Sequence, residues 1–292
     1  MLFEPVDNNY FKPKNTLRCN GDLIDLSKPV VMGILNVTPD SFYDGGCYET
    51  TEKAVQHAGE MLSEGAAIID IGACSTRPGA KEVTAEEELS RLLPVAVEIR
   101  KQFPDAVLSL DTFRAGVAEK VIDAVGDCMI NDISGGTLDE KMFEVVARLQ
   151  VPYILMHIQG TPKTMQQNPV YQDVTKEVIR FLSEKVYRLH EMGVCDVIID
   201  PGFGFGKTVD HNYELFNNLD AFRIFELPLL VGISRKSMIY KYLGSVPEES
   251  LNATTVLNTL ALKGGANILR VHDVRPAVEA IKIVEQLKMF SK

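Results

Sequence analysis

The chain has 292 residues, 46% of them hydrophobic and 24% charged, which is the usual composition of a globular protein. No apolar run approaches the roughly 18 residues of a membrane span, and a formal net charge of −10 repels phosphate backbones, so we expect neither a membrane nor a nucleic acid as partner. The five cysteines are scattered without a Cys-x-x-Cys pair, and residues 1–15 do not resemble a signal peptide. These features predict a reduced, cytoplasmic protein with neither a disulfide framework nor a zinc site.

In chain order, a hairpin signal comes first and strand and helix patterns then alternate. Residues 16–27 place Asn-Gly between two short apolar stretches, which predicts a β-hairpin. Eight apolar runs of strand length follow, at 30–37, 67–72, 107–112, 129–134, 152–157, 197–202, 228–233 and 268–271. Between them lie amphipathic helical patterns, including 52–65, 85–102, 174–193 and 253–265.

This alternation predicts the fold class. The strands lack polar alternation, as strands covered on both faces do, and this favours a parallel sheet. Eight β/α alternations predict an α/β protein with a TIM (β/α)8 barrel, whose bottom is closed by the N-terminal β-hairpin. No linker interrupts the pattern, so we expect a single domain over residues 1–292, with the barrel proper at about 30–288.

Polar residues stand at the ends of the predicted strands, where TIM barrels carry their active sites. In strand order they are Asn36, Asp70, Asp111, Asn131 with Asp132, His157, Asp200, the run Ser234 to Ser237, and Arg270 with His272. Any one of them could cap a turn or the next helix. A whole ring of polar groups close to a barrel core is costly without a function. The ring therefore predicts a site at this end of the barrel.

One subset of the ring combines two carboxylates, an amide and an ammonium group. It consists of Asp111, Asn131, Asp200 and Lys236. These groups suit a flat heterocycle with donors and acceptors on its edge, such as a 2-amino-4-oxo ring, because a carboxylate accepts two N–H bonds and lysine donates one. Apolar side chains such as Met156 and Phe205 would cover the ring faces.

A second subset suits a diphosphate. It consists of Asn36, Arg77, Arg270 and His272, with Arg235 near. Arginine matches phosphate oxygens two at a time, and the Asn36 oxygen could bind Mg²⁺, which keeps most of its waters and takes few protein ligands. The alternative for Arg270 is a core ion pair with Asp132 or Asp273.

The glycine-rich segment DPGFGFGKT, residues 200–208, resembles a nucleotide-binding loop only superficially. It fails the Walker pattern because position 201 is proline, and the dinucleotide pattern because position 207 is lysine. We interpret it as a strand-to-helix turn whose glycines let the backbone approach a flat ligand. Lys207 is expected to be solvated.

Nine segments, in order, resemble the dihydropteroate synthase family, which joins 6-hydroxymethyl-7,8-dihydropterin diphosphate to p-aminobenzoate in folate biosynthesis. They are NVTPDSFYDGG, STRPGA, SLDTFRA, NDISGG, MHIQGTPKTMQ, DPGFGFGK, GISRKS, LNATTVLNTLAL and LRVHDV, and the resemblance covers essentially residues 30 to 288. The chain departs from the family pattern at Tyr43 and at Ala73-Cys74. Both positions lie in or beside the loops after the first two strands, which leaves loop closure and the response to sulfonamides open.

The resemblance implies roles for individual residues. The pterin would be contacted by Asp111, Asn131, Met156, Asp200, Phe205 and Lys236. The diphosphate would be bound by Asn36, Arg77, Arg270 and His272, with Asn36 on Mg²⁺. The p-aminobenzoate would contact Thr76, Arg77, Pro78, Lys236 and Ser237. Residues 38–46 and 75–79 would close over the substrates, and the catalytic residues would be Arg270, His272, Lys236 and Asp111. The resemblance also implies a homodimer formed by barrel helices and makes the protein a sulfonamide target.

A transferase without a covalent intermediate is expected, because no serine, cysteine or histidine is placed as a nucleophile beside a base. The C–O bond to diphosphate would break first, and Asp111 and Asp200 would favour the resulting cation electrostatically until the arylamine attacks. Two alternatives share the pterin residues: a pterin-barrel methyltransferase with a cobalamin partner, and a catalytically silent pterin-binding paralogue. The methyltransferase does not need TPDSF, STRPG or SRKS, and the silent paralogue is disfavoured because Asn36, Arg270 and His272 are all present.

Overall fold

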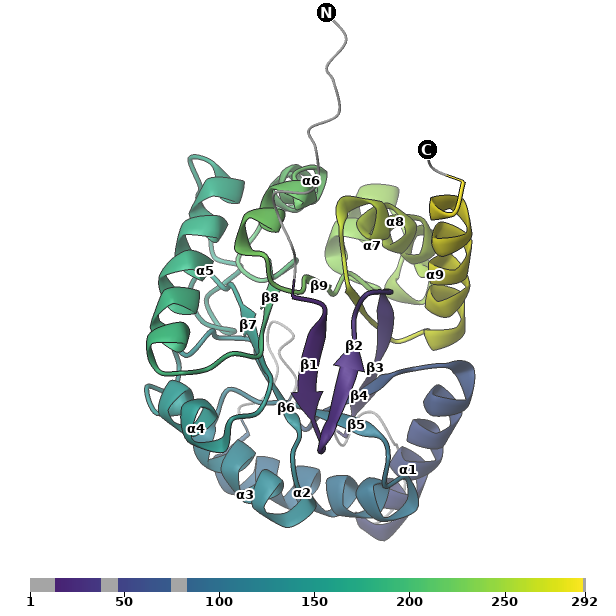
Figure 1. Cartoon of the computed structure of the whole chain (residues 1–292). Helices are drawn as coiled ribbons and strands as arrows, with labels where there is room; N and C mark the ends of the chain where they lie inside the picture. Colours follow the sequence, from purple (N-terminus) through teal and green to yellow (C-terminus); the bar gives the residue numbers. More distant parts are fainter. Residues whose placement is uncertain (1–13, 38–46, 75–82, 291–292) are drawn as a thin grey trace, which may run out of the picture.

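The computed structural model describes residues 14–37, 47–74 and 83–290, with the side chains of residues 47–50 excepted. The predicted loop segments 38–46 and 75–79 lie outside the described residues. A two-stranded antiparallel hairpin precedes an eight-stranded parallel sheet whose order is β8-β7-β6-β5-β4-β3-β10-β9. Figure 1 shows the helices surrounding the strands, with the hairpin at the centre of the view. The predicted TIM barrel with an N-terminal hairpin is confirmed.

The elements fall close to the expected ranges. The hairpin strands are β1 Thr16–Cys19 and β2 Asp22–Asp25, and the barrel strands are β3 Val30–Asn36, β4 Ile68–Gly72, β5 Val107–Asp111, β6 Met129–Asp132, β7 Tyr153–Met156, β8 Val197–Asp200, β9 Leu230–Val231 and β10 Ile268–Val271. The α-helices are α1 Cys47–Glu64, α2 Ala85–Gln102, α3 Ala115–Val125, α4 Met142–Leu149, α5 Val174–Glu191, α6 Val209–Asn217, α7 Ser237–Leu243, α8 Leu251–Gly264 and α9 Val274–Lys288. Two 3-10 helices cover Leu219–Phe225 and Pro247–Glu249.

The barrel closes between β8 and β9. The Ile199 N–H donates to the Pro228 carbonyl at 2.9 Å, and Ile199 forms a parallel bridge with Leu229. The strand expected over residues 228–233 is reduced to β9. Pro228, at the expected start, has no N–H for the ladder. Closure brings the carboxyl ends of the strands around one opening.

The hairpin covers the other opening. Its turn residues Asn20 (φ 55°) and Gly21 (φ 80°) both have positive φ, as a two-residue hairpin turn requires. Its buried side chains Leu17 and Cys19 pack on a layer of interior residues at the amino ends of the strands, which comprises Met32, Ile68, Met129, Ile154, Ile198, Leu230 and Ile268. The N-terminal end of the barrel is therefore filled and apolar.

The period of two along each strand then sets which residues face inward above this layer. Two positions beyond Ile68, Met129, Ile198 and Ile268 come Asp70, Asn131, Asp200 and Arg270, which share the inward face. The intervening residues Ile69, Ile130, Ile199 and Leu269 belong to the outer core between strands and helices. The barrel interior thus changes from apolar to polar within one step of the pleat.

Candidate active site

A buried ionic network crosses the barrel interior. Arg270 from β10 donates from Nε to Asp70 Oδ2 at 2.7 Å and from Nη2 to Asp111 Oδ2 at 2.6 Å. Asn131 Nδ2 donates to the same Asp70 oxygen at 3.0 Å. The structure thus brings together side chains of four strands, two of them 200 positions apart in the sequence.

Register aligns the neighbours of this network. Asp111 is the ladder partner of Asn131 on one side and of Gly72 on the other, and Gly72 is the partner of Asn36. A Cβ on Gly72 would come within 3.2 Å of the Asp111 Cβ, so glycine leaves room for this carboxylate. Asn36, half-buried at the end of β3, therefore stands in one row with Asp111 and Asn131.

Burial and charge perturb the titration of the network. Burial, with the neighbouring Asp70 carboxylate, raises the pKa of Asp111 to about 7, although Arg270 opposes the shift. Burial alone would lower the pKa of Arg270, but Asp70 and Asp111 together raise it. The guanidinium is therefore a fixed positive charge, while Asp111 is poised to exchange a proton near neutral pH.

Lys236 and Asp200 form a second polar group at the same opening, where their charges act on each other and on Arg270. Lys236 Nζ donates to the Phe203 carbonyl and lies 4.6 Å from the centroid of the Phe205 ring. Burial lowers the pKa of Lys236 to about 8 even though Asp200 opposes the shift. Asp200, whose pKa is raised by burial and lowered in turn by Lys236, accepts from the Gly202 N–H at 2.7 Å.

An apolar cluster lies beside these groups. Met156 from β7 packs with Ile133, Ile158 and Met165, and the partly buried rings of Phe113 and Phe205 lie against it. Met156 is also the ladder partner of Asp200. The predicted ring-covering residues Met156 and Phe205 are therefore next to the predicted edge-binding carboxylate.

The glycines of the turn after β8 serve protein packing, which corrects the interpretation that they admit a ligand. A Cβ on Gly202 would lie 1.9 Å from the His157 carbonyl oxygen, one on Gly204 3.2 Å from the Lys236 side chain, and one on Gly206 2.5 Å from the Gln159 carbonyl oxygen. All three glycines have positive φ. They let the turn pack against the loop after β7 and against Lys236.

Lys207 is buried, so the expectation that it is solvated is wrong. It is 3% exposed and donates to His157 Nδ1 at 3.0 Å, to the Gly202 carbonyl at 2.8 Å and to the Phe205 carbonyl at 3.1 Å. Three acceptors on this turn and its neighbour compensate the desolvated ammonium group, which a solvent-facing side chain would not need.

His272 is held by Ser234. Ser234 Oγ lies 3.0 Å from His272 Nδ1, where the tautomer of the ring decides which atom donates, and it accepts from the His272 N–H at 3.2 Å. Arg235 is engaged elsewhere, because its guanidinium binds both carboxylate oxygens of Asp273 at 2.7 and 3.0 Å. Ser237 is half-buried and begins α7 directly after Lys236.

The alternative partners considered for Arg270 are both wrong. Asp273 binds Arg235, and Asp132 faces out of the barrel, where it accepts from the Tyr153 hydroxyl at 2.7 Å and from the Ser134 N–H at 2.7 Å. Thr76, Arg77 and Pro78 lie outside the described residues. Cys74 and Val83, the described residues on either side of this segment, both contact Arg114. Arg114 donates to the Val83 carbonyl at 2.6 Å and contacts Cys74 Sγ at 3.6 Å.

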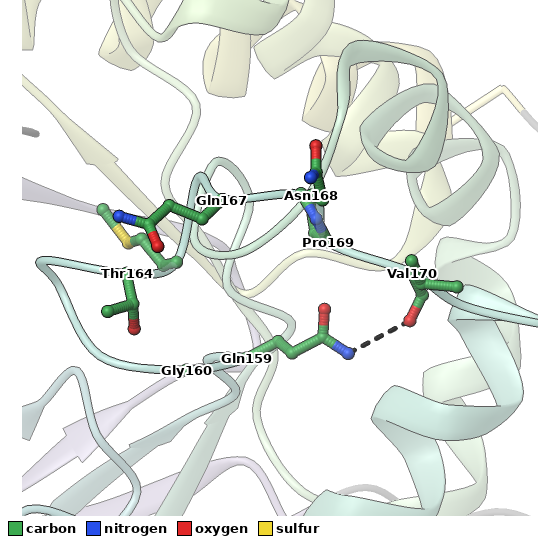
Figure 2. A pocket seen from close by; sticks show the side chains of 8 residues that line it. Gln159, Gly160, Thr164, Gln167, Asn168, Pro169 and Val170 are labelled. Carbon is green, nitrogen blue, oxygen red and sulfur yellow. Dashed lines mark hydrogen bonds between the residues drawn. The ribbon is translucent and has the colours of Figure 1, made fainter.

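The loop after β7 carries a separate cavity of about 350 Å³. Figure 2 shows its lining side chains and the bond from Gln159 Nε2 to the Val170 carbonyl, 3.1 Å long. No predicted site residue lines it. Its lining residue Met165 also packs against Met156, which places the cavity behind the apolar cluster rather than at the ionic network.

No group of three or more His, Cys, Asp or Glu side chains able to hold a metal occurs within residues 14–37, 47–74 and 83–290. The side-chain oxygen of Asn36 is a hard donor of the type that Mg²⁺ prefers, and one such protein ligand fits that coordination.

Comparisons with known proteins show the family of this chain. Residues 32–272 match the family described as "Pterin binding enzyme". Dihydropteroate synthase of Escherichia coli (strain K12) is 47% identical over 272 residues, which cover 92% of this chain and 95% of that protein. The chain belongs to the dihydropteroate synthase family.

Solved structures of dihydropteroate synthases have the same fold. A crystal structure of the Yersinia pestis enzyme in complex with a sulfonamide drug is 46% identical, covers 94% of this chain and 99% of that one, and gives a TM-score of 0.87. The Xanthomonas albilineans enzyme with 4-aminobenzoic acid is 40% identical, with coverages of 95% and 99% and a TM-score of 0.88. This chain is accordingly a transferase of the dihydropteroate synthase family.

Sequence reasoning left three residues of this dihydropteroate synthase site without a role. Asp70 was noted only as a strand end, yet it is fully buried, binds Arg270 and Asn131, and keeps Oδ1 without a hydrogen-bond partner in the described part of the chain. Its position two residues after the inward-facing Ile68 was the available signal. For Lys207 and His157 the sequence carries no comparable signal, because their contact joins two loops.

Proposed function

We propose that this chain condenses 6-hydroxymethyl-7,8-dihydropterin diphosphate with p-aminobenzoate to give 7,8-dihydropteroate and diphosphate. One observation carries this proposal: the barrel interior presents carboxylates, an amide and an ammonium group around one opening, beside an apolar cluster. Asp111, Asn131, Asp200 and Lys236 are the donors and acceptors that the amino-amide edge of a pterin requires. Met156 and Phe205 supply the apolar contact for its faces.

The diphosphate is assigned to Arg270 and His272, with Arg77 contributing from outside the described residues. Arg270 already carries a fixed charge held between two carboxylates, so a diphosphate would share the guanidinium with Asp111. Ser234 Oγ contacts His272 Nδ1, so we assign the diphosphate to the other ring nitrogen, Nε2, in its N–H form. Fixed donors of this kind stabilise the charge that develops on a leaving group.

Magnesium is proposed at Asn36, where one protein oxygen would supplement water and diphosphate oxygens. When bound, Mg²⁺ neutralises charge on the departing diphosphate. The pairing of Asn36 with Gly72 and of Gly72 with Asp111 places these three residues in one row. This row places the side-chain amide of Asn36 at the edge of the pterin-binding groups.

The reaction exchanges one bond for another at the pterin methylene carbon. The C–O bond breaks and its electron pair leaves with diphosphate; the arylamine nitrogen then forms the C–N bond and releases a proton. Asp111 and Asp200 lie on the pterin side and favour the positive charge that arises between these events. This path requires no enzyme nucleophile, although Ser234 Oγ lies 3.0 Å from His272 Nδ1.

The p-aminobenzoate subsite is proposed along Thr76, Arg77, Pro78, Lys236 and Ser237. Lys236 stands beside Ser237 at the start of α7, at the same opening as Asp200. The Yersinia pestis relative is bound to a sulfonamide drug, and we propose sulfonamides as competitors of p-aminobenzoate here as well.

A homodimer is proposed through the adjacent helices α8 and α9 (Figure 1). Val256 and Leu260 on α8 are 53% and 50% exposed, and Ile283 and Leu287 on α9 are 61% and 58% exposed. The spacing of four residues in each pair gives both helices an apolar outer stripe that a second copy would cover. Sedimentation velocity at micromolar concentration tests this: a monomer would contradict it.

A cytoplasmic location is proposed from the free state of the described cysteines, Cys19, Cys74, Cys128 and Cys195. Among the described helices, none is both long and apolar enough to span a membrane.

The function is tested by mixing the purified chain with p-aminobenzoate, in the presence and absence of the pterin diphosphate and Mg²⁺. The proposal predicts consumption of p-aminobenzoate with formation of dihydropteroate only when the pterin diphosphate is present. A methyltransferase would leave p-aminobenzoate unchanged and act on methyl-tetrahydrofolate instead. A silent binding protein would bind the pterin diphosphate without turnover.

A further inference from the structure

Lys207 is a buried amine that the reaction as described does not use, and burial lowers its pKa to about 7 although Asp200 opposes the shift. In its protonated form its three protons meet three acceptors: the Gly202 carbonyl, the Phe205 carbonyl and His157 Nδ1. A buried ammonium group is costly, and an apolar side chain of similar volume is often as stable or more so. These contacts can form together in only one conformation of the turn after β8.

This geometry bears directly on Lys236. The two carbonyls that Lys207 holds bracket Phe203, whose own carbonyl accepts from Lys236 Nζ. Phe205, whose carbonyl Lys207 holds, places its ring 4.6 Å from Lys236 Nζ. Both contacts that fix the Lys236 ammonium group therefore belong to a turn held by Lys207.

The other carbonyls of the turn are bonded from the opposite side. Gln166 Nε2 donates to the Gly204 carbonyl at 2.7 Å, and the Tyr171 hydroxyl donates to the Gly206 carbonyl at 2.7 Å. These donors are neutral and come from the loop after β7. They hold the same turn without bracketing Phe203, which makes Tyr171 a matched control for Lys207.

We propose that Lys207 is a positioning residue for Lys236, acting through the Phe203 carbonyl and the Phe205 ring, with His157 as its fixed acceptor. This inference rests on the proposed function, in which Lys236 contacts the pterin. It assigns the lysine of the GFGFGK segment to shaping the pterin pocket rather than to binding phosphate.

His157 has a defined protonation state in this arrangement. When Lys207 is protonated, His157 Nδ1 accepts from its ammonium group and the ring proton is on Nε2. Burial and the neighbouring Lys207 lower the pKa of His157 to about 2, which keeps the ring neutral. The ring is further fixed by an edge contact with Phe181 at 5.0 Å between centroids.

A double-mutant cycle tests the link to Lys236. Calorimetry measures the dissociation constant of 6-hydroxymethyl-7,8-dihydropterin diphosphate for the wild type, Lys207→Met, Lys236→Met and the double variant. We expect Lys207→Met to weaken binding about tenfold in the wild type and less than about twofold in the Lys236→Met background. An equal factor in both backgrounds would overturn the inference, because a generally loosened turn would act independently of Lys236.

Tyr171→Phe is the control for loss of a hydrogen bond to the turn, and we expect its dissociation constant within about twofold of the wild type. A weakening equal to that of Lys207→Met would count against a role specific to Lys207. If the wild type itself does not bind the pterin diphosphate, the proposed function fails; if the wild type binds it and the cycle is additive, only this inference fails.

Variants of His157 keep the test available if Lys207→Met does not fold. Asparagine can present its side-chain oxygen near the position of Nδ1, whereas leucine cannot accept a hydrogen bond. His157→Asn should bind the pterin diphosphate within about twofold of the wild type and His157→Leu about fivefold more weakly. In ¹⁵N NMR of the wild type, His157 should show an unprotonated Nδ1; a protonated Nδ1 or equal affinities of the two variants would contradict the arrangement.

Discussion

Replacement of Asp70 by leucine removes the fully buried partner of Arg270. Asp70 Oδ2 accepts from Arg270 Nε at 2.7 Å and from Asn131 Nδ2 at 3.0 Å, and its side chain is 0% exposed. Removing one member of a buried ion pair typically costs ~3–5 kcal/mol, because the remaining charge stays buried. We expect Asp70→Leu to lower the free energy of unfolding by about this amount. The isosteric Asp70→Asn retains an acceptor for Arg270 and should lose ~1.5–3 kcal/mol.

The measurement is urea denaturation at neutral pH, with Glu119→Gln as the matched control. Glu119 pairs with Arg148 at 2.6 Å between α3 and α4, but the two side chains are 37% and 56% exposed. Loss of such an exposed pair costs ~0.2–1 kcal/mol. If Asp70→Leu loses no more than Glu119→Gln, then Asp111 alone compensates Arg270 and the importance assigned to Asp70 is refuted.

Two further predictions concern the same network. Because the folded state keeps a proton on Asp111 up to about pH 7, whereas an unperturbed aspartate loses it near pH 3.8, the folded state binds more protons between these values. The free energy of unfolding contributed by Asp111 therefore falls as pH rises through this window, by at most ~1.4 kcal/mol per pH unit. The Asp111→Asn variant should abolish that fall. Parallel curves of unfolding free energy against pH for the variant and the wild type would contradict this. Arg270→Ala should lower kcat by about a hundredfold or more and Phe205→Ala by less than about tenfold, as steady-state assays of p-aminobenzoate consumption would measure; equal effects would remove the diphosphate role of Arg270.

The strands and the site end of the barrel were predictable because the signals are local. The strands are largely apolar runs, and the inward residues Asp70, Asn131, Asp200 and Arg270 each follow an inward apolar one at a spacing of two, as Ile198 precedes Asp200. Asp111 follows the buried Ser109 instead. The N-cap Thr84 with Glu87 gives α2 the start expected from the sequence. Only β9 is much shorter than its pattern, and at the expected start Pro228 cannot donate to a ladder.

The partners within the site were not predictable, because they depend on how far each strand is shifted along its neighbour. Arg270 was weighed against Asp132, but the pleat turns Asp132 to the outer face, where Tyr153 donates to it. The shift of the closed sheet instead brings Asp70 and Asp111 beside the guanidinium. A list of charged residues in sequence cannot give this shift.

The glycine-rich turn shows the same limit. Its positive-φ glycines were recognisable as a tight turn, but a close approach to a ligand and a close approach to protein have the same sequence signature. His157 and Gln159, which the glycines contact, lie more than 40 positions earlier. For the same reason Lys207 could not be distinguished from a solvated lysine.

The most direct test of the central claim is calorimetric titration of 6-hydroxymethyl-7,8-dihydropterin diphosphate into the wild type and Asp200→Asn. The account places the pterin edge on Asp200 at the carboxyl end of β8, so the variant loses a charge-assisted acceptor and should bind about ten- to a hundredfold more weakly. Asp196→Asn, at the hairpin end of the barrel where Asp196 binds Lys14, should bind like the wild type. Unchanged affinity in Asp200→Asn, or equal losses in both variants, would contradict a pterin site at this opening.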